Sequence, residues 1–219
     1  MSINKSYVAF FDLDKTILSV NSGKILVLAA YKKGLLSNTN FAKAIVLSLV
    51  YKLHLINNIK ITELMAKWLK GVKKTELENL SNTIIRETLL KNIRLIIKKE
   101  IDLHKNNNAQ LIILSASMPN ICIPIAKYLE FDDIICSKME IVNNLFTGKS
   151  KGKICMGEQK AFLLKEYCIN NSFNLNKAFY YGDSISDKEA LEIVGNPICI
   201  FPQRKLLRIA EKNNWKIIN

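Results

Sequence analysis

The stretch at residues 7–17, YVAFFDLDKTI, constrains what this chain can fold into more than any other. Residues 7–11 form a short apolar run, partly aromatic and β-branched, which is typical of a strand buried on both faces. Asp12 and Asp14 follow where such a strand would leave its sheet. Because residues two apart in an extended chain point the same way, both carboxylates can face one site. Two like charges this close favour a cation between them, and Mg²⁺ binds through oxygens.

The order of the expected elements predicts an α/β fold with an insert. Residues 18–85 read as helical throughout, whereas strands and helices alternate in the second half, which is typical of a doubly wound parallel sheet with a Rossmann-like core. We therefore predict an α/β core formed by residues 1–17 and 86–219, and an all-helical cap formed by residues 18–85. The first cap helix is expected at residues 22–33, with Ser22 as its capping residue, and two more at 41–56 and 62–70. A fourth begins at the capping-box pattern Thr75-x-x-Glu78.

The core elements after the cap follow from apolar runs and turn residues. We expect one long amphipathic helix over residues 88–105, and a hairpin over residues 139–147 in which Asn143 and Asn144 supply the positive φ angles. The remaining strands are expected at residues 110–114, 133–136, 177–181 and 198–201, and the remaining helices at residues 119–129, 158–168, 187–194 and 203–212.

Composition limits the partners and the compartment. The chain has 32 Lys and Arg against 19 Asp and Glu, a net charge of +13, which favours phosphorylated metabolites, nucleic acid or an anionic membrane surface. Its five cysteines lack any Cys-x-x-Cys, and no secretory leader is recognisable, so we expect reduced thiols in a cytoplasmic protein. The longest apolar stretch, residues 44–51, is far shorter than the ~20 residues of a membrane span.

Polar side chains follow the predicted strands at four places. An isolated Asp-x-Asp is more often a plain polar turn, and here the buried strand before it, Thr16 behind it and the later positions favour a site. If the strands are parallel neighbours, these groups converge at one edge of the sheet. Carboxylates, a hydroxyl and an ammonium together suit phosphoryl transfer. The converging residues are Asp12, Asp14, Ser115, Lys160, Asp183 and Asp187.

These segments also carry a family resemblance. DLDKT, ILSAS, GEQK and YGDSISD, in this order, resemble the four motifs of the haloacid dehalogenase superfamily. The similar subfamily is the phosphoserine-phosphatase-like one, which has a helical cap between the first two motifs, and the resemblance covers essentially the whole chain. It implies a Mg²⁺-dependent phosphomonoester hydrolase that forms an aspartyl phosphate and acts on a small phosphorylated metabolite.

The resemblance also implies roles for individual residues. Asp12 matches the nucleophile. Asp14 matches the general acid and base, whose backbone carbonyl also binds Mg²⁺ in family members. Lys160 matches the lysine that neutralises nucleophile and phosphate. Asp183 matches the second metal carboxylate, so that Asp12, Asp14 and Asp183 form the expected metal set, and Asp187 matches the carboxylate that orients the lysine or a metal-bound water.

The phosphate-binding groups are implied in the same way. Ser115 matches the phosphate-binding hydroxyl, the backbone N–H of Ala116 assists it, and Thr16 supports the loop around the phosphate. From the residues alone, Ser115 and Asp187 could equally cap the helices that follow them. Three further lysines remain open as substitutes for Lys160, namely Lys149, Lys151 and Lys153.

The departures from the family pattern concern the substrate. Phosphoserine phosphatases hold the amino group with a Glu shortly after the first motif, where this chain reads Ser19-Val-Asn-Ser22. The second motif reads Ser-Ala-Ser, where Ser-Gly-Gly is common in those enzymes, so the resemblance does not extend to phosphoserine itself. We expect the cap to set specificity, with Asn21, Ser22 and Lys24 lining the mouth of the site.

Two other functions stay open. Some relatives dephosphorylate phosphatidylglycerophosphate, and a lipid-phosphate phosphatase could use the apolar helix at residues 41–56 for peripheral membrane contact. A non-catalytic protein that binds anions or nucleic acid would also explain the charge of +13. Acidic residues at the matching motif positions disfavour a nucleic-acid partner, because a protein without catalysis has no physical reason to keep them.

Overall fold

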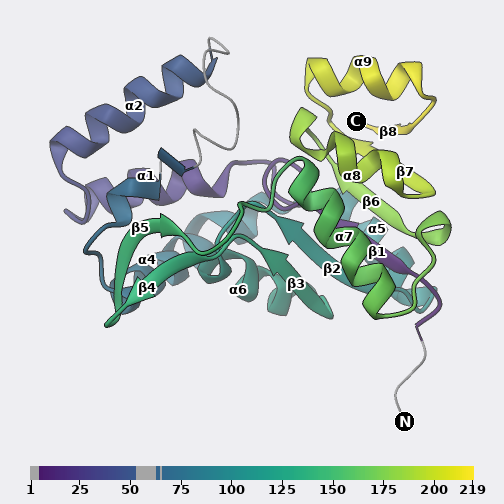
Figure 1. Ribbon diagram of the computed structural model, residues 1–219, viewed down its shortest axis with the longest axis horizontal. Helices are drawn as coiled ribbons and strands as arrows, with labels where there is room; N and C mark the ends of the chain where they lie inside the picture. The colour runs from purple at the N-terminus through teal and green to yellow at the C-terminus, as the bar shows by residue number, and fades with distance from the viewer. Residues whose placement is uncertain (1–4, 53–62, 65) are drawn as a thin grey trace.

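A single parallel sheet forms the centre of the molecule (Figure 1). The computed structural model describes residues 5–52, 63–64 and 66–219. All neighbouring strands of the sheet are parallel, in the order β3-β2-β1-β6-β7-β8. The doubly wound α/β fold expected from the sequence is therefore confirmed. The strands are β1 (Val8–Phe11), β2 (Gln110–Ser115), β3 (Asp133–Cys136), β6 (Phe179–Gly182), β7 (Asn196–Ile200) and β8 (Lys216–Ile218).

Helices cover both faces of the sheet, which explains why the first strand is apolar at every position. Val8 and Phe10 point into one core, whereas Ala9 and Phe11 point into the other, and all four are fully buried. The first core is closed by α7, α8 and α9, and the second by α5 and α6 (Figure 1). These helices are α5 (Leu95–Asn106), α6 (Pro119–Leu129), α7 (Glu158–Asn170), α8 (Lys188–Ile193) and α9 (Arg204–Lys212).

The strand order reverses direction beside β1. The chain runs from β1 to β2 and β3 on one side, and it then returns to β6 on the other side of β1. In open α/β sheets, ligands bind at the carboxyl ends of the strands where the order reverses. Asp12 directly follows β1 and Asp183 directly follows β6, so the topology places these two residues at that point.

The described elements of residues 18–92 are helical and lie to one side of the sheet (Figure 1). The linkers into and out of this segment pair with each other, because Arg94 N donates to Ile17 O at 2.9 Å and Ser19 N donates to Asn92 O at 2.8 Å. The described elements of the segment are α1 (Ser22–Lys32), α2 (Asn38–Lys52), the 3-10 turn η1 (Lys67–Leu69) and α4 (Lys74–Ile84).

Several helix boundaries differ from the sequence prediction. Asn21, and not Ser22, caps α1, since its side chain accepts from Lys24 N at 2.9 Å. α4 starts one residue before Thr75, and its first turn is closed by the Glu76 carboxylate, which accepts from the N–H of residue 73 at 3.3 Å. A carboxylate three residues after the capping residue is the usual partner, and Glu76 offers it two residues earlier than the expected Glu78.

The predicted long helix over residues 88–105 is broken. A π-helical turn (Ile85–Leu89) and a 3-10 turn (Leu90–Asn92) precede α5, and Ile93 and Arg94 adopt extended backbone between them. The periodic apolar pattern continues across the break, so it gave no sign of this exit from the helical segment. The expected helix at 41–56 begins three residues earlier, at Asn38; its residues 53–56 and the expected helix start at Thr62 lie outside the described residues.

The predicted hairpin exists and packs against the helical segment. β4 (Met139–Val142) and β5 (Leu145–Ser150) are joined by Asn143 and Asn144, both with positive φ. Phe146 exchanges backbone hydrogen bonds with the loop after η1, donating to Val72 O at 3.0 Å and accepting from Gly71 N at 2.8 Å. The hairpin thus joins the two parts of the chain that we predict as separate units, and the division at residues 18–85 stays a prediction.

Three smaller features complete the fold. β8 at the sheet edge was missed, because three residues offer no periodic pattern. All five cysteines are free, as expected. Among the described residues, none of the helices combines the length and the apolar character that a bilayer span requires.

A buried polar chain lies beneath the sheet on the α5 side. His104 is fully buried, and its Nδ1 and Nε2 each lie 2.8 Å from a phenol oxygen, of Tyr7 and Tyr181 respectively. Tyr181 in turn donates to the carboxylate of Glu100 at 2.6 Å. Burial lowers the pKa of His104 to about 4, so the imidazole is neutral at physiological pH.

This neutral histidine predicts a loss of stability in mild acid. Between pH 6.5 and about 4 the unfolded chain binds a proton at residue 104 that the folded protein does not, so the free energy of unfolding falls as the pH is lowered. The loss attributable to His104 is ~3 kcal/mol across this window. We expect His104→Gln to remove that part of the pH dependence, measured by denaturant unfolding at pH 7 and pH 4.5. Identical pH dependence in wild type and variant would contradict it.

Candidate active site

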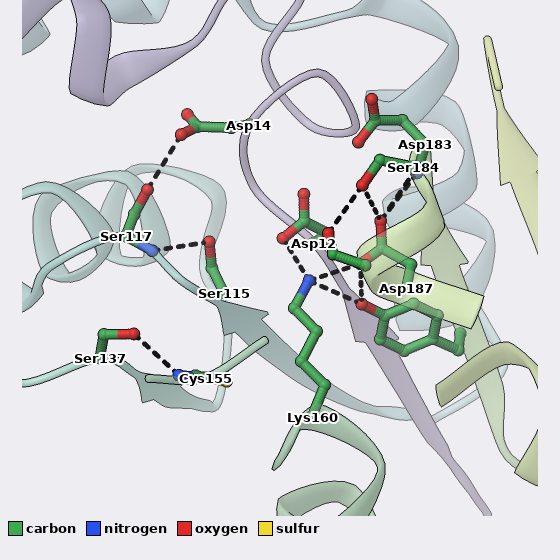
Figure 2. A network of polar contacts seen from close by, with 12 residues as sticks. Asp12, Asp14, Ser115, Ser117, Ser137, Cys155, Lys160, Asp183, Ser184 and Asp187 are labelled. Carbon is green, nitrogen blue, oxygen red and sulfur yellow. Dashed lines mark hydrogen bonds and ion pairs between the residues drawn. The ribbon is translucent and has the colours of Figure 1, made fainter. Parts of the chain in front are cut away.

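The carboxyl ends of β1 and β6 bring acidic residues together as the sequence predicts (Figure 2). Oxygens of Asp12, Asp183 and Asp187 all lie within 4.8 Å of one another, and all three residues are buried. Asp12 is fixed to the neighbouring strand by its N–H, which donates to Tyr181 O at 2.9 Å. The ends of β1 and β6, together with the turn that follows β6, therefore position the three carboxylates.

Lys160 is the cation that enters this acidic group. It lies in the first turn of α7, only 2% of its surface is exposed, and its Nζ lies 2.7 Å from Asp12 Oδ1 and 2.5 Å from Asp187 Oδ1. Its third contact is Tyr180 Oη, at 2.9 Å. Burial alone would lower the pKa of Lys160, but the two carboxylates hold that pKa well above its ordinary value. Lys160 is therefore charged and fully used in bonds.

Asp187 is held in place from several sides. Its Oδ1 accepts from Tyr180 Oη at 2.7 Å, and its Oδ2 accepts from both the N–H and the hydroxyl of Ser184, each at 3.1 Å. Burial opposes ionisation of Asp187, but Lys160 and these donors outweigh it, so its pKa lies below the ordinary range. A Cβ at Gly182 would stand 2.6 Å from that of Asp187, so the glycine permits this close approach.

Asp12 and Asp183 lack comparable compensation. Burial raises the pKa of Asp12 to about 7, although Lys160 works against it. Burial and the neighbouring Asp187 raise the pKa of Asp183 to about 8, although Gln203 Nε2 donates to its carboxylate at 2.9 Å. The cluster thus carries more negative charge than its lysine neutralises. A buried, oxygen-only donor set with excess negative charge fits a hard divalent cation such as Mg²⁺.

The Asp14 carboxylate lies apart from this cluster, in a second part of the site. Lys15 has a positive φ of 68°, so the chain turns sharply directly after Asp14. The Asp14 carboxylate accepts from Ser22 N at 2.8 Å and from Ser117 Oγ at 3.1 Å (Figure 2). Burial nevertheless raises the pKa of Asp14.

The acidic side chains that lie together are those of Asp12, Asp183 and Asp187, and the expected metal set of Asp12, Asp14 and Asp183 stays a prediction. The acidic group contains Asp12 and Asp183 as expected, together with Asp187, whereas the Asp14 carboxylate is engaged with serine donors instead. A contribution of the Asp14 backbone carbonyl stays a prediction. Exposed Lys149, Lys151 and Lys153 are not among the partners of the acidic group, and Lys160 is.

The expected phosphate-binding residues lie at the end of β2. Ser115 is 1% exposed, its Oγ accepts from Ser117 N at 3.2 Å, and Figure 2 places it on the side of Asp12 toward Asp14. Ala116 follows it and is partly exposed. Thr16 is fully buried, and its Oγ1 has no hydrogen-bond partner among the described residues. Contact of these three residues with a phosphate stays a prediction.

The expected mouth residues differ in their surroundings. The Asn21 side chain caps α1, whereas Lys24 is exposed, and a role of either in specificity stays a prediction. Ser22 is 1% exposed and belongs to the site, because its N–H holds Asp14 and its Oγ lies 3.1 Å from Ser117 Oγ.

Four residues of the site were missed from the sequence: Tyr180, Ser184, Gln203 and Ser117. Strand alternation could have found Tyr180, since it shares with Phe10 the face that α7 covers. Ser117 and Ser184 lie inside recognised segments and needed only to be read as donors. Gln203 lies 20 residues beyond Asp183, and only the fold brings its amide there.

The comparisons with known proteins agree with this geometry. A family model described as haloacid dehalogenase-like hydrolase matches residues 9–192. Phosphoserine phosphatase SerB1 of Mycobacterium tuberculosis is 25% identical over 224 residues, which cover 98% of this chain and 71% of that protein. The match to the family model spans most of the sequence, including every residue of the acidic cluster and Lys160.

Solved structures share the fold. A protein of unknown function from Bordetella pertussis Tohama I has a TM-score of 0.84 at 22% identity, covering 97% of each chain. A phospho-aspartyl intermediate analogue of a phosphoserine phosphatase has a TM-score of 0.74 at 16% identity, covering 97% of this chain and 92% of that one. These similarities support the architecture, and the family match supplies the assignment: the chain belongs to the haloacid dehalogenase-like hydrolases.

Proposed function

We propose that this hydrolase is a Mg²⁺-dependent phosphatase that cleaves a small phosphorylated metabolite through an aspartyl-phosphate intermediate. The observation that carries the proposal is the pairing of two carboxylates in different surroundings. Asp12 lies against Lys160 at 2.7 Å, whereas Asp14 is held apart by serine donors and has a raised pKa. Carboxylates whose surroundings differ in this way can divide nucleophilic and acid–base work between them.

The proposed reaction has two steps. In the first, an Asp12 oxygen forms a bond to phosphorus while the bond from phosphorus to the leaving oxygen breaks, and protonated Asp14 gives its proton to that oxygen. In the second, the Asp14 carboxylate takes a proton from water, which attacks phosphorus and releases Asp12 and inorganic phosphate. Burial raises the pKa of Asp14 and so favours the protonated form that the first step needs.

The remaining residues bind and orient. Lys160 holds Asp12 in position and offsets its charge as the anionic phosphate enters, and Asp187 holds Lys160. Ser115 and the backbone N–H of Ala116 bind phosphate oxygens, with Thr16 supporting the loop below. Asp12 and Asp183, together with the Asp14 backbone carbonyl, would hold Mg²⁺, which supplies positive charge for the phosphate oxygens.

The alternatives have less support. A lipid-phosphate phosphatase would need a membrane contact, for which the exposed side chains of Ile45 and Val46 on α2 are the sole described candidates among the residues predicted for this role. A non-catalytic anion-binding protein does not account for the buried Asp12, Asp183 and Asp187, because three buried carboxylates repel an anion unless a cation is present. We therefore favour catalysis on a phosphorylated small molecule.

The nucleophile assignment predicts the effect of Asp12→Asn. The amide has the shape of the carboxylate but no charge with which to attack phosphorus, so we expect release of phosphate from 4-nitrophenyl phosphate with Mg²⁺ to fall to background. Circular dichroism should show an unchanged fold. Asp102→Asn, at an exposed position of α5, is the matched control and should keep full activity. Activity of Asp12→Asn within a few-fold of wild type would refute the assignment.

The acid assignment predicts a dependence on the leaving group. Asp14→Asn should lower the turnover of an alkyl phosphate by ~10²–10⁴-fold, because the alkoxide leaves poorly without a proton. An aryl phosphate leaves as a stable phenolate, so its first step should lose much less. The measurement is single-turnover formation of the alcohol or phenol with both substrate types. Equal losses for the two would rule out proton donation by Asp14.

A further inference from the structure

A groove at the β4–β5 hairpin is lined by none of the residues assigned to catalysis. Its cavity volume is ≈ 510 Å³, and it lies between the β4–β5 hairpin, α4 and the start of α6. Its apolar wall includes Leu77, Met118 and Phe146, together with Ile141 and Val142, which are 39% and 53% exposed. This volume falls within the ~300–1,000 Å³ of small-molecule sites in proteins.

The charged side chains of the groove are unequally compensated. Lys74 pairs with Glu78 on α4 at 3.6 Å, and Glu140 accepts from Thr147 Oγ1 at 2.7 Å. Lys138 and Lys151, in contrast, have no acidic partner within 4.0 Å among the described residues.

These two lysines are neighbours in the lining of the groove. Lys151 N donates to Lys138 O at 2.8 Å, so the two residues lie opposite each other on paired backbone, and both line the groove. This pair therefore carries positive charge without an internal counter-charge. The first turn of α6 also lines the groove, through Pro119 and Asn120.

The groove shares a backbone segment with the catalytic site. Met118 lines the groove, and the residue before it, Ser117, donates to the Asp14 carboxylate at 3.1 Å. On the other side, Asn120 Nδ2 donates to Ser81 Oγ and so ties this segment to α4. One short segment, Ser117 and Met118, therefore contacts both the group that would protonate the leaving oxygen and a cavity with apolar walls and two lysines unpaired among the described residues.

From this we infer that the groove binds the leaving group of the substrate, and that this leaving group is a compact apolar body bearing a second anionic group. The inference rests on the proposed phosphatase function and names its substrate class. The apolar wall buries the body, Lys138 and Lys151 hold the second anion, and the phosphoester oxygen lies toward Asp14. The serine of phosphoserine is too small to fill ≈ 510 Å³ and has no apolar portion for the wall.

The substrate arm of the test compares three phosphomonoesters. We expect kcat/KM to rank 6-carboxy-2-naphthyl phosphate first, 2-naphthyl phosphate second and O-phosphoserine last. The carboxylate should improve kcat/KM about tenfold, the size expected from two exposed ion pairs. A wild-type enzyme that prefers O-phosphoserine, or that does not distinguish the two naphthyl esters, would overturn the inference.

The variant arm locates the preference. Lys138→Gln with Lys151→Gln should abolish the gain from the carboxylate and leave turnover of 2-naphthyl phosphate unchanged. The matched control is Lys149→Gln with Lys153→Gln, which removes the same charge from exposed positions that do not line the groove. Equal effects of the two double variants would show a general effect of charge and refute binding of the leaving group in the groove.

A binding measurement separates this inference from the proposed function. The fluorescence of 6-hydroxy-2-naphthoate should report saturable binding to Asp12→Asn, which needs no turnover, and the Lys138→Gln and Lys151→Gln pair should weaken it about tenfold. Binding without any phosphatase activity in wild type would refute the proposed function and keep the groove as an anion site. Phosphatase activity without this binding would refute the inferred role of the groove in binding the leaving group, and the proposed function would stand.

Discussion

The buried ammonium of Lys160 is the interaction on which the rest of the site depends. A lysine that is 2% exposed is costly to bury unless it is paired, and here Asp12 and Asp187 both contact it. Holding those carboxylates in turn requires Tyr180 from β6 and the close approach at Gly182. Several elements far apart in sequence are thus fixed relative to one another by a single charge.

The charge of Lys160 does not offset all the negative charge of the acidic cluster. Lys160 offsets the carboxylates that it touches, but Asp183 is left with an amide donor and a pKa near 8. In an apolar surrounding this excess of acid is stable only when protonated or when a cation is present. The strand order places the acids at the carboxyl ends of β1 and β6, where a ligand has access, so the topology and the electrostatics indicate the same function.

The sequence was enough to predict the sheet except for its edge strand β8, and to predict the residues of the acidic cluster, because the signals for both are local. The apolar run before Asp12 reports burial on two faces, and the turn residues mark where each strand ends. The sequence was not enough where contacts between residues far apart in the chain determine a helix boundary or a side-chain partner. The break at Ile93 is set by pairing of the two linkers, the helix cap moved to Asn21, and Gln203 reaches Asp183 only through the fold. The groove at the hairpin, likewise, is lined by residues far apart in sequence, which the pairing of Phe146 with the loop after η1 helps to bring together.

The most direct test of this account is the thermal stability of wild type and Asp183→Asn with and without Mg²⁺. Asparagine can still accept from Gln203, so the variant removes one charge and little else. Without Mg²⁺ we expect the variant to be the more stable, since repulsion is relieved. With Mg²⁺ the wild type should gain ~2.7 kcal/mol at a concentration 100 times its Kd and overtake the variant, which gains little. A wild type that is unaffected by Mg²⁺, or a variant that gains equally, would contradict a cation site built from Asp12 and Asp183.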